Sequence, residues 1–432
     1  MDTIKQPVKP RILMLTTSAQ ANLAAGGRTR IVSELRYALV GSSRLTLLAL
    51  VPPRQWLPLR KLFRARSALQ KDAGCTVFYW PALPTGGCRW LRWLTNRIHA
   101  FVVLLFARLL RVDGIHAHGQ SAALLATHVR GGGRRWLLWD VHGACPEEYE
   151  FATETPDRRW IAELESEERR ILASADCVVF VSEAMRNHYL NKYQLPPRQS
   201  CVVPCATDAA VHLDFSSRTR LRQDYRVADR LVFVYAGSYR KYQMADEMVA
   251  LFKAIRDRFP QSFFLILTGD QARFSQAAQA GALRVEDYRI LSLTHEEVLK
   301  TLPLADVGFL LRANAAVNRV ASPTKFAEYC ICGVPVLLTP FVGDFSLVVD
   351  RERVGFCLPE FQLTTGLIEF LQRVQSEREI YAERCHQYAS KELTWLSAGS
   401  TLKAAYARLA SDRPIEPARL KLASRINHGR MD

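Results

Sequence analysis

The sequence predicts an α/β fold in which two doubly wound, Rossmann-like domains face each other across a cleft. The chain has 432 residues, a length that suits two or three domains. Short apolar runs alternate with amphipathic helical segments, as in parallel sheets that are covered by helices. This alternation breaks off near residue 210 and then begins again. We therefore expect an N-terminal domain at 1–210 and a C-terminal domain at 211–394. A helix at about 395–412 is expected to pack back on the first domain, ahead of a basic tail at 413–432.

The first half is expected to begin with a strand, a loop of small residues and a helix. The loop ends in Gly26 and Gly27, which let backbone approach a ligand closely, although a plain turn accounts for the pair equally well. The elements expected in this half are strands at 11–17, 45–51, 114–117, 136–141, 177–181 and 201–204, and helices at 28–39 and 160–174.

The second half follows a charged, Arg-rich segment at 216–230, which is expected to be a passage between the domains. Thr294 and Glu297 then have the spacing of a capping box at a helix start. The elements expected in this half are strands at 231–236, 263–268, 288–291, 306–311 and 334–338, and helices at 246–259, 294–302, 325–332 and 395–409.

The formal net charge of +16 points to acidic partners, which could be nucleic acid, anionic lipid or phosphorylated small molecules. Hydrophobic residues make up 49% of the chain, so a large core is expected and a disordered class is excluded. The ten cysteines include no Cys-x-x-Cys pair, which favours reduced thiols in a cytosolic protein over a zinc site. The first residues contain no apolar signal core, and no run reaches the roughly 18 apolar residues that span a bilayer.

Two segments between residues 54 and 111 interleave basic and aromatic side chains. An interfacial helix has this composition, because its cations meet anionic headgroups while its aromatic rings sit at the acyl boundary. The alternative is a solvated basic face over ordinary core packing. We expect contact with an anionic membrane surface and no nucleic-acid partner, since no recognised nucleic-acid module appears. The residues are Arg54, Trp56, Arg60, Lys61, Phe63 and Arg64 in the first segment, and Arg89, Trp90, Arg92, Trp93 and Arg97 in the second.

The stretch at 322–338 reads as a loop, a capped helix, a glycine and a core strand. Ser322 is expected to cap the helix, with Pro323 and Thr324 in its first turn. Free N–H groups and the helix dipole at such a start favour a phosphate, above all beside the carboxyl ends of parallel strands. This stretch therefore predicts an anion-binding site in the C-terminal domain.

Six short segments occur in an order shared with one family of enzymes. They are Gly26-Gly27-Arg28, Ile115-His116-Ala117-His118, residues 175–183, residues 203–208, Tyr235-Ala236-Gly237-Ser238, and Glu328 followed by residues 333–336. In this order they resemble glycosyltransferase family 4 (group 1) over roughly residues 11–360. The resemblance implies the GT-B fold, a nucleotide-sugar donor on the C-terminal domain, an acceptor on the N-terminal domain, and transfer with retention of anomeric configuration.

Two departures from the family pattern concern the donor site. The family often carries two glutamates eight positions apart, and here Val320 takes the earlier place while Glu328 keeps the later one. Arg240, Lys241 and Gln243 occupy the loop in which the family usually has an Arg and a more distant Lys. These departures leave open which group contacts the sugar.

A sugar that leaves a nucleoside diphosphate leaves growing negative charge on that diphosphate. The chain contains no Asp-x-Asp motif, with which metal-using transferases hold this charge, so we expect no metal and no cofactor besides the nucleotide-sugar substrate. Protein cations and helix N–H groups are expected to hold the charge instead. Arg240 and Lys241 are the expected catalytic cations, of which one could point away from the cleft. The expected donor-binding residues are Gly237, Ser238, Gln243, Ser322, Pro323, Thr324, Lys325 and Glu328.

Two of these donor-side residues have an ordinary alternative. Glu328 is expected to accept the two hydroxyls of a ribose, but it could be a surface glutamate that the helix dipole favours. Lys325 is expected to meet the diphosphate, but it could be a solvated lysine.

On the acceptor side, His118 and His142 follow strands of the first domain and are expected to orient the acceptor or to move its proton. A purely structural role is the alternative for both. Asp140 could orient His142 or point to the opposite face, because neighbouring strand residues alternate. Glu183 could contact the acceptor or cap a helix. The expected acceptor-side residues are Gly26, Gly27, Arg28, Asp140 and Glu183.

These expectations combine into a metal-independent hexosyltransferase that acts on a saccharide or lipid-linked acceptor in polysaccharide or glycolipid biosynthesis. It is expected to be cytoplasmic and peripheral on the inner membrane face. Two alternatives stay open. A catalytically inactive assembly protein that binds sugar nucleotides is favoured by Val320. A nucleotide-sugar epimerase of the same fold would need no basic amphipathic surface.

Overall fold

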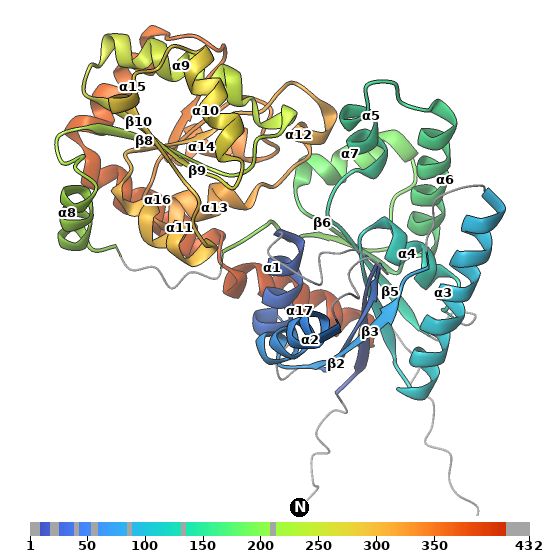
Figure 1. The fold of residues 1–432 in the computed structure, drawn as a ribbon. Coiled ribbons are helices and arrows are strands. Elements are labelled where there is room, and N and C mark those ends of the chain that lie inside the picture. Colours follow the sequence, from blue (N-terminus) through green and yellow to red (C-terminus); the bar gives the residue numbers. More distant parts are fainter. Residues whose placement is uncertain are drawn as a thin grey trace, which may run out of the picture.

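The computed structural model describes residues 9–17, 26–38, 43–52, 59–83, 89–130, 135–207 and 213–411. Two α/β domains follow one another along the chain, and each is built around its own parallel sheet (Figure 1). The expected pair of doubly wound domains is therefore confirmed. Among the described residues, no helix has both the length and the apolar character needed to span a bilayer.

The described residues of the N-terminal domain form a seven-stranded parallel sheet with the order β3-β2-β1-β4-β5-β6-β7. Side chains alternate along each strand, so Leu13 and Leu15 enter one core while Ile12 and Met14 enter the other. The strands are β1 Arg11–Thr16, β2 Arg44–Val51, β3 Thr76–Pro81, β4 Gly114–His118, β5 Trp136–Val141, β6 Cys177–Phe180 and β7 Ser200–Val202. The helices are α1 Gly26–Ser33, the π-helical η2 Glu34–Ala38, α2 Leu59–Ala73, α3 Arg89–Leu109, α4 Gln120–Thr127, α5 Cys145–Ala152, α6 Arg158–Ser174 and α7 Glu183–Tyr193.

The C-terminal domain has a six-stranded parallel sheet with the order β10-β9-β8-β11-β12-β13 among the described residues. Its strands are β8 Leu231–Ala236, β9 Ser262–Leu267, β10 Tyr288–Leu291, β11 Val307–Leu310, β12 Val336–Leu338 and β13 Gly355–Cys357. Its longer helices are α8 Phe215–Asp224, α9 Ala245–Arg258, α10 Gln271–Ala280, α11 His295–Thr301, α13 Thr324–Ile331, α14 Phe345–Arg351, α15 Thr365–Ser376 and α16 Arg378–Glu392. Its shorter helices are η4 Lys241–Gln243, η5 Val285–Asp287, η6 Leu302–Leu304 and α12 Ala316–Arg319.

The last described helix, α17 Trp395–Ser411, crosses back to the first domain. Leu402 and Tyr406 are buried in the core on the face of the N-terminal sheet that carries Ile12 and Met14. The crossing is fixed by backbone hydrogen bonds, because Thr207 N–H donates to Leu393 O and Trp395 N–H donates to Thr207 O. The expected basic tail at 413–432 lies outside the described residues.

The segment at 216–230, which was expected to be a passage between domains, lies largely in α8 and belongs to the C-terminal domain. Arg218 and Arg222 on this helix are buried and bind the Asp306 carboxylate at 2.7 and 3.1 Å. Arg378 on α16 binds the same carboxylate at 2.7 Å. The arginines that suggested a solvated linker therefore tie two helices to the start of β11.

Side-chain contacts join the two domains where α7 begins. Ser182 caps α7 by accepting a hydrogen bond from Met185 N–H, and its hydroxyl also donates to Val320 O at 2.7 Å. Asp344 of the C-terminal domain accepts hydrogen bonds from the backbone N–H groups of Glu183 and Ala184 at 2.7 and 2.9 Å. One helix of the first domain is thus capped by a carboxylate of the second.

Candidate functional site

In the C-terminal domain, polar side chains gather at the carboxyl ends of β8 and β11. Gly237 directly follows β8, and Arg312 comes two residues after the last residue of β11. The first turn of α13 brings Lys325 to the same place, where its Nζ atom lies 2.9 Å from Gln243 Oε1. The carboxyl edge of a parallel sheet is where open α/β folds bind ligands. We call Gly237, Gln243, Arg312 and Lys325 the C-terminal site.

Two cations share one neutral partner in this site. Arg312 and Lys325 both donate to Gln243 Oε1. Burial lowers the pKa of Lys325 well below its usual range; the nearby Arg312 lowers it further, while Glu328 opposes the shift. Burial also lowers the pKa of Arg312. Both shifts measure how poorly the site solvates positive charge, so an anion placed here would be strongly stabilised.

Gly237 allows Lys325 to approach the sheet. A Cβ atom on Gly237 would stand 2.4 Å from Lys325 Nζ and 2.9 Å from the Tyr235 hydroxyl. The Tyr235 ring lies beneath the lysine, with Nζ 4.8 Å from its centroid, and the Tyr235 hydroxyl donates to Ser238 O at 2.8 Å. The structure thus brings together Gly237, Ser238, Gln243 and Lys325, as the sequence predicted for the donor side.

Glu328 lies one turn further along α13 and is largely buried. Its Oε1 atom is 2.8 Å from His295 Nε2 at the start of α11, and the His295 side chain is 61% exposed. One carboxylate oxygen is therefore held by a surface imidazole. The placement fits the expected contact with ribose hydroxyls and differs from the alternative of an exposed surface glutamate.

The helix start at α13 differs from the expectation in one detail. Pro323 occupies the N-cap position, and no side chain caps the helix. The expected cap, Ser322, accepts a hydrogen bond from Cys205 N–H at 3.0 Å and so holds the N-terminal domain instead. Thr324 is the first helical residue. The N–H groups of the first turn are left without a side-chain cap, which keeps them available to an anion.

Arg240 and Lys241, the expected catalytic cations, are both exposed, and no described contact joins either side chain to Gln243 or Lys325; the Gln243 N–H donates only to the backbone carbonyl of Arg240, at 2.8 Å. Lys241 Nζ lies 5.3 Å from the ring centroid of Phe151 on α5 of the other domain. The buried cation that sequence reasoning missed is Arg312. Its position directly after an apolar strand was the available signal, because polar residues at strand carboxyl ends face the ligand edge.

Val320 stands where the family often has its first glutamate, and its side chain packs into the N-terminal core rather than into the C-terminal site. It is 4% exposed, and its carbonyl accepts the Ser182 hydroxyl. A glutamate here would bring a charge into an apolar interdomain contact. The valine is therefore explained by domain packing.

In the N-terminal domain, Asp140 at the end of β5 is the centre of a buried polar cluster. Arg30 on α1 donates to both carboxylate oxygens of Asp140 at 2.8 and 2.9 Å, and to Val203 O at 3.0 Å. Although burial opposes it, the charge of Arg30 and the imidazole of His142 hold the pKa of Asp140 well below its usual range. Asp140 is thus a fixed negative charge that points toward the histidines, and not to the opposite face.

The expected pair His118 and His142 is brought together. His118 Nδ1 lies 3.1 Å from His142 Nε2, which in turn lies 3.0 Å from Asp140 Oδ2. His118 is buried, and burial lowers its pKa to about 4, so its neutral form dominates at pH 7. The His142 side chain is 18% exposed. Of the two, His142 is the one placed to reach an acceptor, with Asp140 as its orienting partner.

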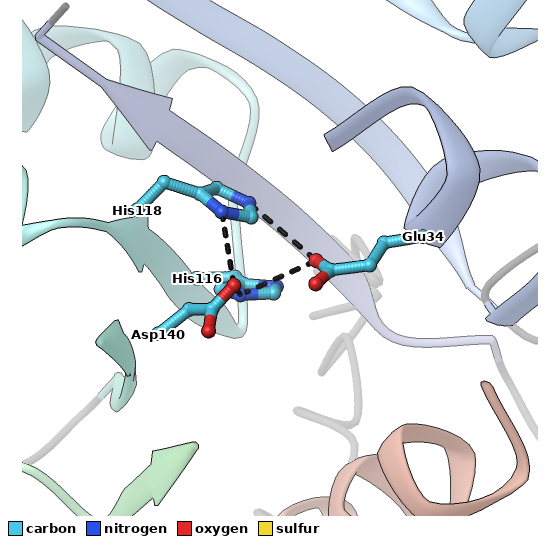
Figure 2. Close-up of side chains that lie close together, drawn as sticks. All are labelled: Glu34, His116, His118 and Asp140. Carbon is cyan, nitrogen blue, oxygen red and sulfur yellow. Dashed lines mark ion pairs between the residues drawn. The ribbon is translucent and has the colours of Figure 1, made fainter. Parts of the chain in front are cut away.

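Like Arg30, Glu34 and His116 belong to this cluster but were not singled out from the sequence as site residues. His116 stacks on His118 with ring centroids 4.2 Å apart, and its Nδ1 atom lies 2.6 Å from the Tyr406 hydroxyl on α17. Figure 2 shows Glu34 facing His116, His118 and Asp140 from the opposite side. Burial and the nearby Asp140 raise the pKa of Glu34 well above its usual range, which favours its protonated form. Neither residue could be recognised as a site residue from the sequence, because Glu34 lies within a helix and His116 within a strand.

Among the described residues, Glu34, His116, His118 and Asp140 form a group whose ligand atoms lie within 4.8 Å of one another. The Nε2 atoms of His116 and His118 each lie 3.8 Å from Glu34 Oε2. A tetrahedral zinc site with bonds of about 2.1 Å has ligands about 3.4 Å apart, so these side chains would have to close in to hold such an ion. Arg30 already supplies the positive charge that Asp140 needs. The expectation of metal-independent transfer concerns the donor diphosphate, and it stays a prediction.

The remaining acceptor-side expectations fall elsewhere. Gly26, Gly27 and Arg28, expected around the end of a loop, are instead the first three residues of α1, and the side chain of Arg28 lies outside the described part of the structure. Glu183 opens α7, where its side chain pairs with Arg186 at 2.6 Å and is 49% exposed. Its backbone N–H contacts Asp344, so this residue lies at the domain junction.

A pair of parallel sheets joined by a returning C-terminal helix is the architecture of the GT-B fold. Residues 45–211 match the family model described as Glycosyltransferase Family 4. This match confirms the resemblance to that family and the expectation of a glycosyltransferase. No curated protein matches the chain significantly by sequence.

Solved structures with the same fold cover nearly the whole chain. Sucrose-phosphate synthase from Thermosynechococcus elongatus superposes with a TM-score of 0.71 at 17% identity, over 94% of this chain and 100% of that one. HepE from Anabaena, solved in complex with UDP, gives 0.69 at 14% identity, over 92% and 100%. WaaG, a glycosyltransferase involved in lipopolysaccharide biosynthesis, gives 0.61 at 13% identity, over 92% and 99%. At these identities the likeness establishes the GT-B fold.

Proposed function

We propose that this protein transfers a sugar from a nucleoside diphosphate donor, without a metal ion and with retention of anomeric configuration. The observation that carries the proposal is the pairing of Lys325 and Arg312 around Gln243, at the carboxyl edge of the C-terminal sheet. A diphosphate is the anion that suits two adjacent buried cations. Structures of HepE with UDP and with UDP-glucose support a uridine diphosphate sugar as the first donor to test.

The geometry suggests how the leaving group is stabilised. As the glycosidic bond to the diphosphate breaks, negative charge grows on the phosphate oxygens. Lys325 Nζ, the Arg312 guanidinium and the uncapped N–H groups of α13 are fixed in place before the reaction begins. A helix start contributes roughly 0.3–2 kcal/mol, and removal of a preorganised donor from such a site typically costs about 100-fold or more in rate. Glu328 orients the nucleoside by accepting its ribose hydroxyls.

On the acceptor side, we assign His142 the role of orienting the acceptor hydroxyl or receiving its proton. Asp140 holds His142 at 3.0 Å and is itself fixed by Arg30. The acceptor is a saccharide or a lipid-linked saccharide in polysaccharide or glycolipid synthesis, and the protein works in the cytoplasm at the inner face of an anionic membrane. WaaG, which shares the fold, is described as acting in lipopolysaccharide biosynthesis and lends support to this setting.

A catalytically inactive sugar-nucleotide-binding protein is the second candidate, because the place of the first family glutamate is taken by Val320. Val320 is buried in the domain junction, so of the two family glutamate positions only that of Glu328 carries a carboxylate. A nucleotide-sugar epimerase of the same fold is less well supported, since it does not use an acceptor site such as the one around His142.

A thermal-shift screen with UDP, GDP, ADP and CDP, followed by their sugar conjugates, tests the donor. Binding to the native state raises the melting temperature by mass action, so one nucleotide should stand out. Hydrolysis of the matching sugar donor by wild type and by Glu328→Ala then separates an enzyme from a binding protein. The proposal expects wild-type turnover that falls at least roughly tenfold in Glu328→Ala. Binding without turnover would favour the inactive protein, and no nucleotide binding would reject both.

A further inference from the structure

A cavity of about 540 Å³ lies in the N-terminal domain, at the carboxyl ends of β1, β2 and β3 and against α3, α4 and α6. Its volume falls within the roughly 300–1,000 Å³ of typical small-molecule sites. The donor site lies in the other domain, so the donor does not explain this cavity. We call it the α3 cavity.

The walls of the α3 cavity are mainly apolar. The one arginine in its lining, Arg92, already forms ion pairs, because its Nη2 atom lies 2.6 Å from a Glu163 carboxylate oxygen and 2.9 Å from one of Glu167. The Arg92 guanidinium also stacks 4.2 Å from the Trp160 ring. A neutralised cation does not attract an anion, so the cavity suits an apolar ligand. Its apolar lining includes Leu50, Leu83, Leu124, Leu125, Trp160 and Leu164.

The α3 cavity and the acceptor-side histidines lie at the same carboxyl edge of the N-terminal sheet, but the side chain of His118 is on the opposite face from the cavity, beside His116 and Glu34. Thr16 pairs with His118 in the register of β1 and β4, and the next residue, Thr17, lines the cavity. Ser121, three residues after His118, lines it as well. A molecule whose polar end is held at His142 would pass over this edge, beside Thr17, to place an apolar chain in the cavity.

The opposite side of α3 is an apolar stripe that is left exposed among the described residues. Its large apolar residues recur every three or four positions along the helix, and Trp90, Phe101 and Leu109 are 65%, 65% and 72% exposed. Trp80, itself 39% exposed, packs edge-on against Phe106 of α3 and extends the stripe to β3. The stripe is made up of Trp80, Trp90, Leu94, Ile98, Phe101, Leu105 and Leu109.

The charged residues around this stripe indicate what kind of surface it binds. The 21 residues of α3 contain no aspartate or glutamate, and the exposed Arg97 and Arg108 flank the stripe, with Arg111 just beyond the helix. Apolar rings bordered by cations match the boundary between anionic headgroups and acyl chains. Arg54 and Trp56 of the other basic segment lie outside the described residues, and the rest of that segment lies on α2, whose Leu62 and Leu69 pack on the opposite face of the sheet. The two segments therefore do not form one surface, and α3 is the element that fits a bilayer.

We propose that the α3 cavity binds the apolar chain of an amphiphilic acceptor, which is taken from an anionic bilayer on which the outward stripe of α3 lies. Leu83 connects the two, because it lines the cavity and is also 40% exposed beside β3. This proposal rests on the proposed function, which it deepens by naming the class of acceptor. The chain of the acceptor occupies the cavity while its polar head reaches His142.

Flotation with vesicles tests the stripe. Wild type should float with vesicles of phosphatidylcholine that contain phosphatidylglycerol, and not with phosphatidylcholine alone, because the cations require anionic headgroups. The Trp90→Gln/Phe101→Gln variant should float roughly tenfold less. The matched control is Leu347→Gln/Leu396→Gln, which removes two C-terminal residues that are 78% and 74% exposed, and it should float like wild type. Equal flotation of both variants, or no flotation of wild type, would overturn the membrane assignment and favour a protein partner for the stripe.

Filling the cavity tests the ligand class. The probe is dansyl-labelled undecanoic acid, whose fluorescence rises when it enters an apolar site. Asn96→Trp and Ser121→Trp replace polar cavity residues at partly or fully exposed positions, so the fold should survive, and both should weaken probe binding at least roughly tenfold. Ser376→Trp, on the exposed side of α15, is the control and should bind like wild type.

Titration of each variant with UDP separates this proposal from the proposed function. Suppose that wild type and the filled variants all bind UDP. If they then bind the probe equally well, or if none of them binds it, the acceptor proposal is wrong and the donor proposal stands. If none of the proteins binds UDP, the donor proposal is wrong. Unchanged melting temperatures would show that the filled variants keep their fold.

Discussion

Gly237 shows how one missing side chain shapes the C-terminal site. Lys325 Nζ occupies the space that a Cβ atom on residue 237 would need, and the Tyr235 ring supports the lysine from below. The ammonium group is thereby placed at the end of β8, and no carboxylate among the described residues forms an ion pair with it. Such a cation lacks full compensation until an anion arrives, which is what a diphosphate site requires.

Gly237→Ala should therefore weaken donor binding roughly tenfold or more, because the new methyl group displaces Lys325. The fold should persist, since the clashing atom is the end of a flexible side chain. Titration with UDP measures the effect. Gly269→Ala is the matched control, because a Cβ atom at residue 269 would meet nothing within 4 Å. Equal affinity of both variants would contradict this role for Gly237.

The buried histidines predict a pH dependence of stability. The pKa of His118 falls from 6.5 in the unfolded chain to about 4 in the folded one, because burial penalises its charged form. Between these two values the unfolded state binds more protons, so stability should fall as the pH drops from about 6.5 to about 4. Urea unfolding at several pH values should give a shallower slope for His118→Asn than for wild type. Identical slopes would show that His118 does not contribute.

At the level of single residues, the sequence placed Gln243, Lys325, Asp140 and both cleft histidines in clusters that the structure also contains. It missed Arg312 and Arg30, which are buried at 5% and 3% exposure. An arginine is usually a surface residue, and its burial depends on a partner far along the chain, such as Asp140 for Arg30. One sequence on its own does not show which residues far apart along the chain pair with each other.

Among the elements, the apolar strands were the easiest to predict. β5 and β8 have the expected bounds, because fully buried parallel strands appear as uninterrupted apolar runs. The capping box of Thr294 and Glu297 is also present as expected. The edge strand β3 was missed, since its residues are partly exposed and mixed in character. α8 was missed because its buried arginines resemble a solvated charged segment.

Asp306 links three elements and gives a prediction of stability. Its carboxylate binds Arg218, Arg222 and Arg378 and also accepts the Val232 N–H at 2.8 Å. Asp306→Ala leaves these buried cations without a counter-charge and should cost about 3–5 kcal/mol of unfolding free energy. Glu369→Ala, an exposed acid on α15, should change the free energy by less than about 0.5 kcal/mol. Denaturant unfolding compares the two, and similar costs would refute the anchoring role.

The whole molecule is held together by contacts that no local pattern reveals. The C-terminal helix returns to the N-terminal core, and Asp344 caps a helix of the opposite domain. The two-domain division and the return of the last helix were expected from the rhythm of the elements and from the family resemblance. The details of the junction were not, because Val320 and Ser322 were interpreted as donor-side residues.

Leu402→Ala tests the importance of the returning helix. Leu402 is fully buried on α17 within the N-terminal core, so its truncation should cost about 2–5 kcal/mol. Leu396→Ala on the same helix is the control, since its side chain is 74% exposed and should cost less than about 0.5 kcal/mol. Equal free energies of unfolding for the two variants would indicate that α17 does not stabilise the domain.

Calorimetric titration with UDP in the presence of EDTA asks whether protein cations alone bind the donor diphosphate. We expect wild type to bind UDP under these conditions, and Lys325→Ala to bind at least roughly tenfold more weakly. Lys300→Ala should bind like wild type, because Lys300 is an exposed residue that pairs with Glu296 on the surface of α11. Binding that appears only after a divalent ion is added, or equal affinity of wild type and Lys325→Ala, would contradict a metal-independent site built on Lys325 and Arg312.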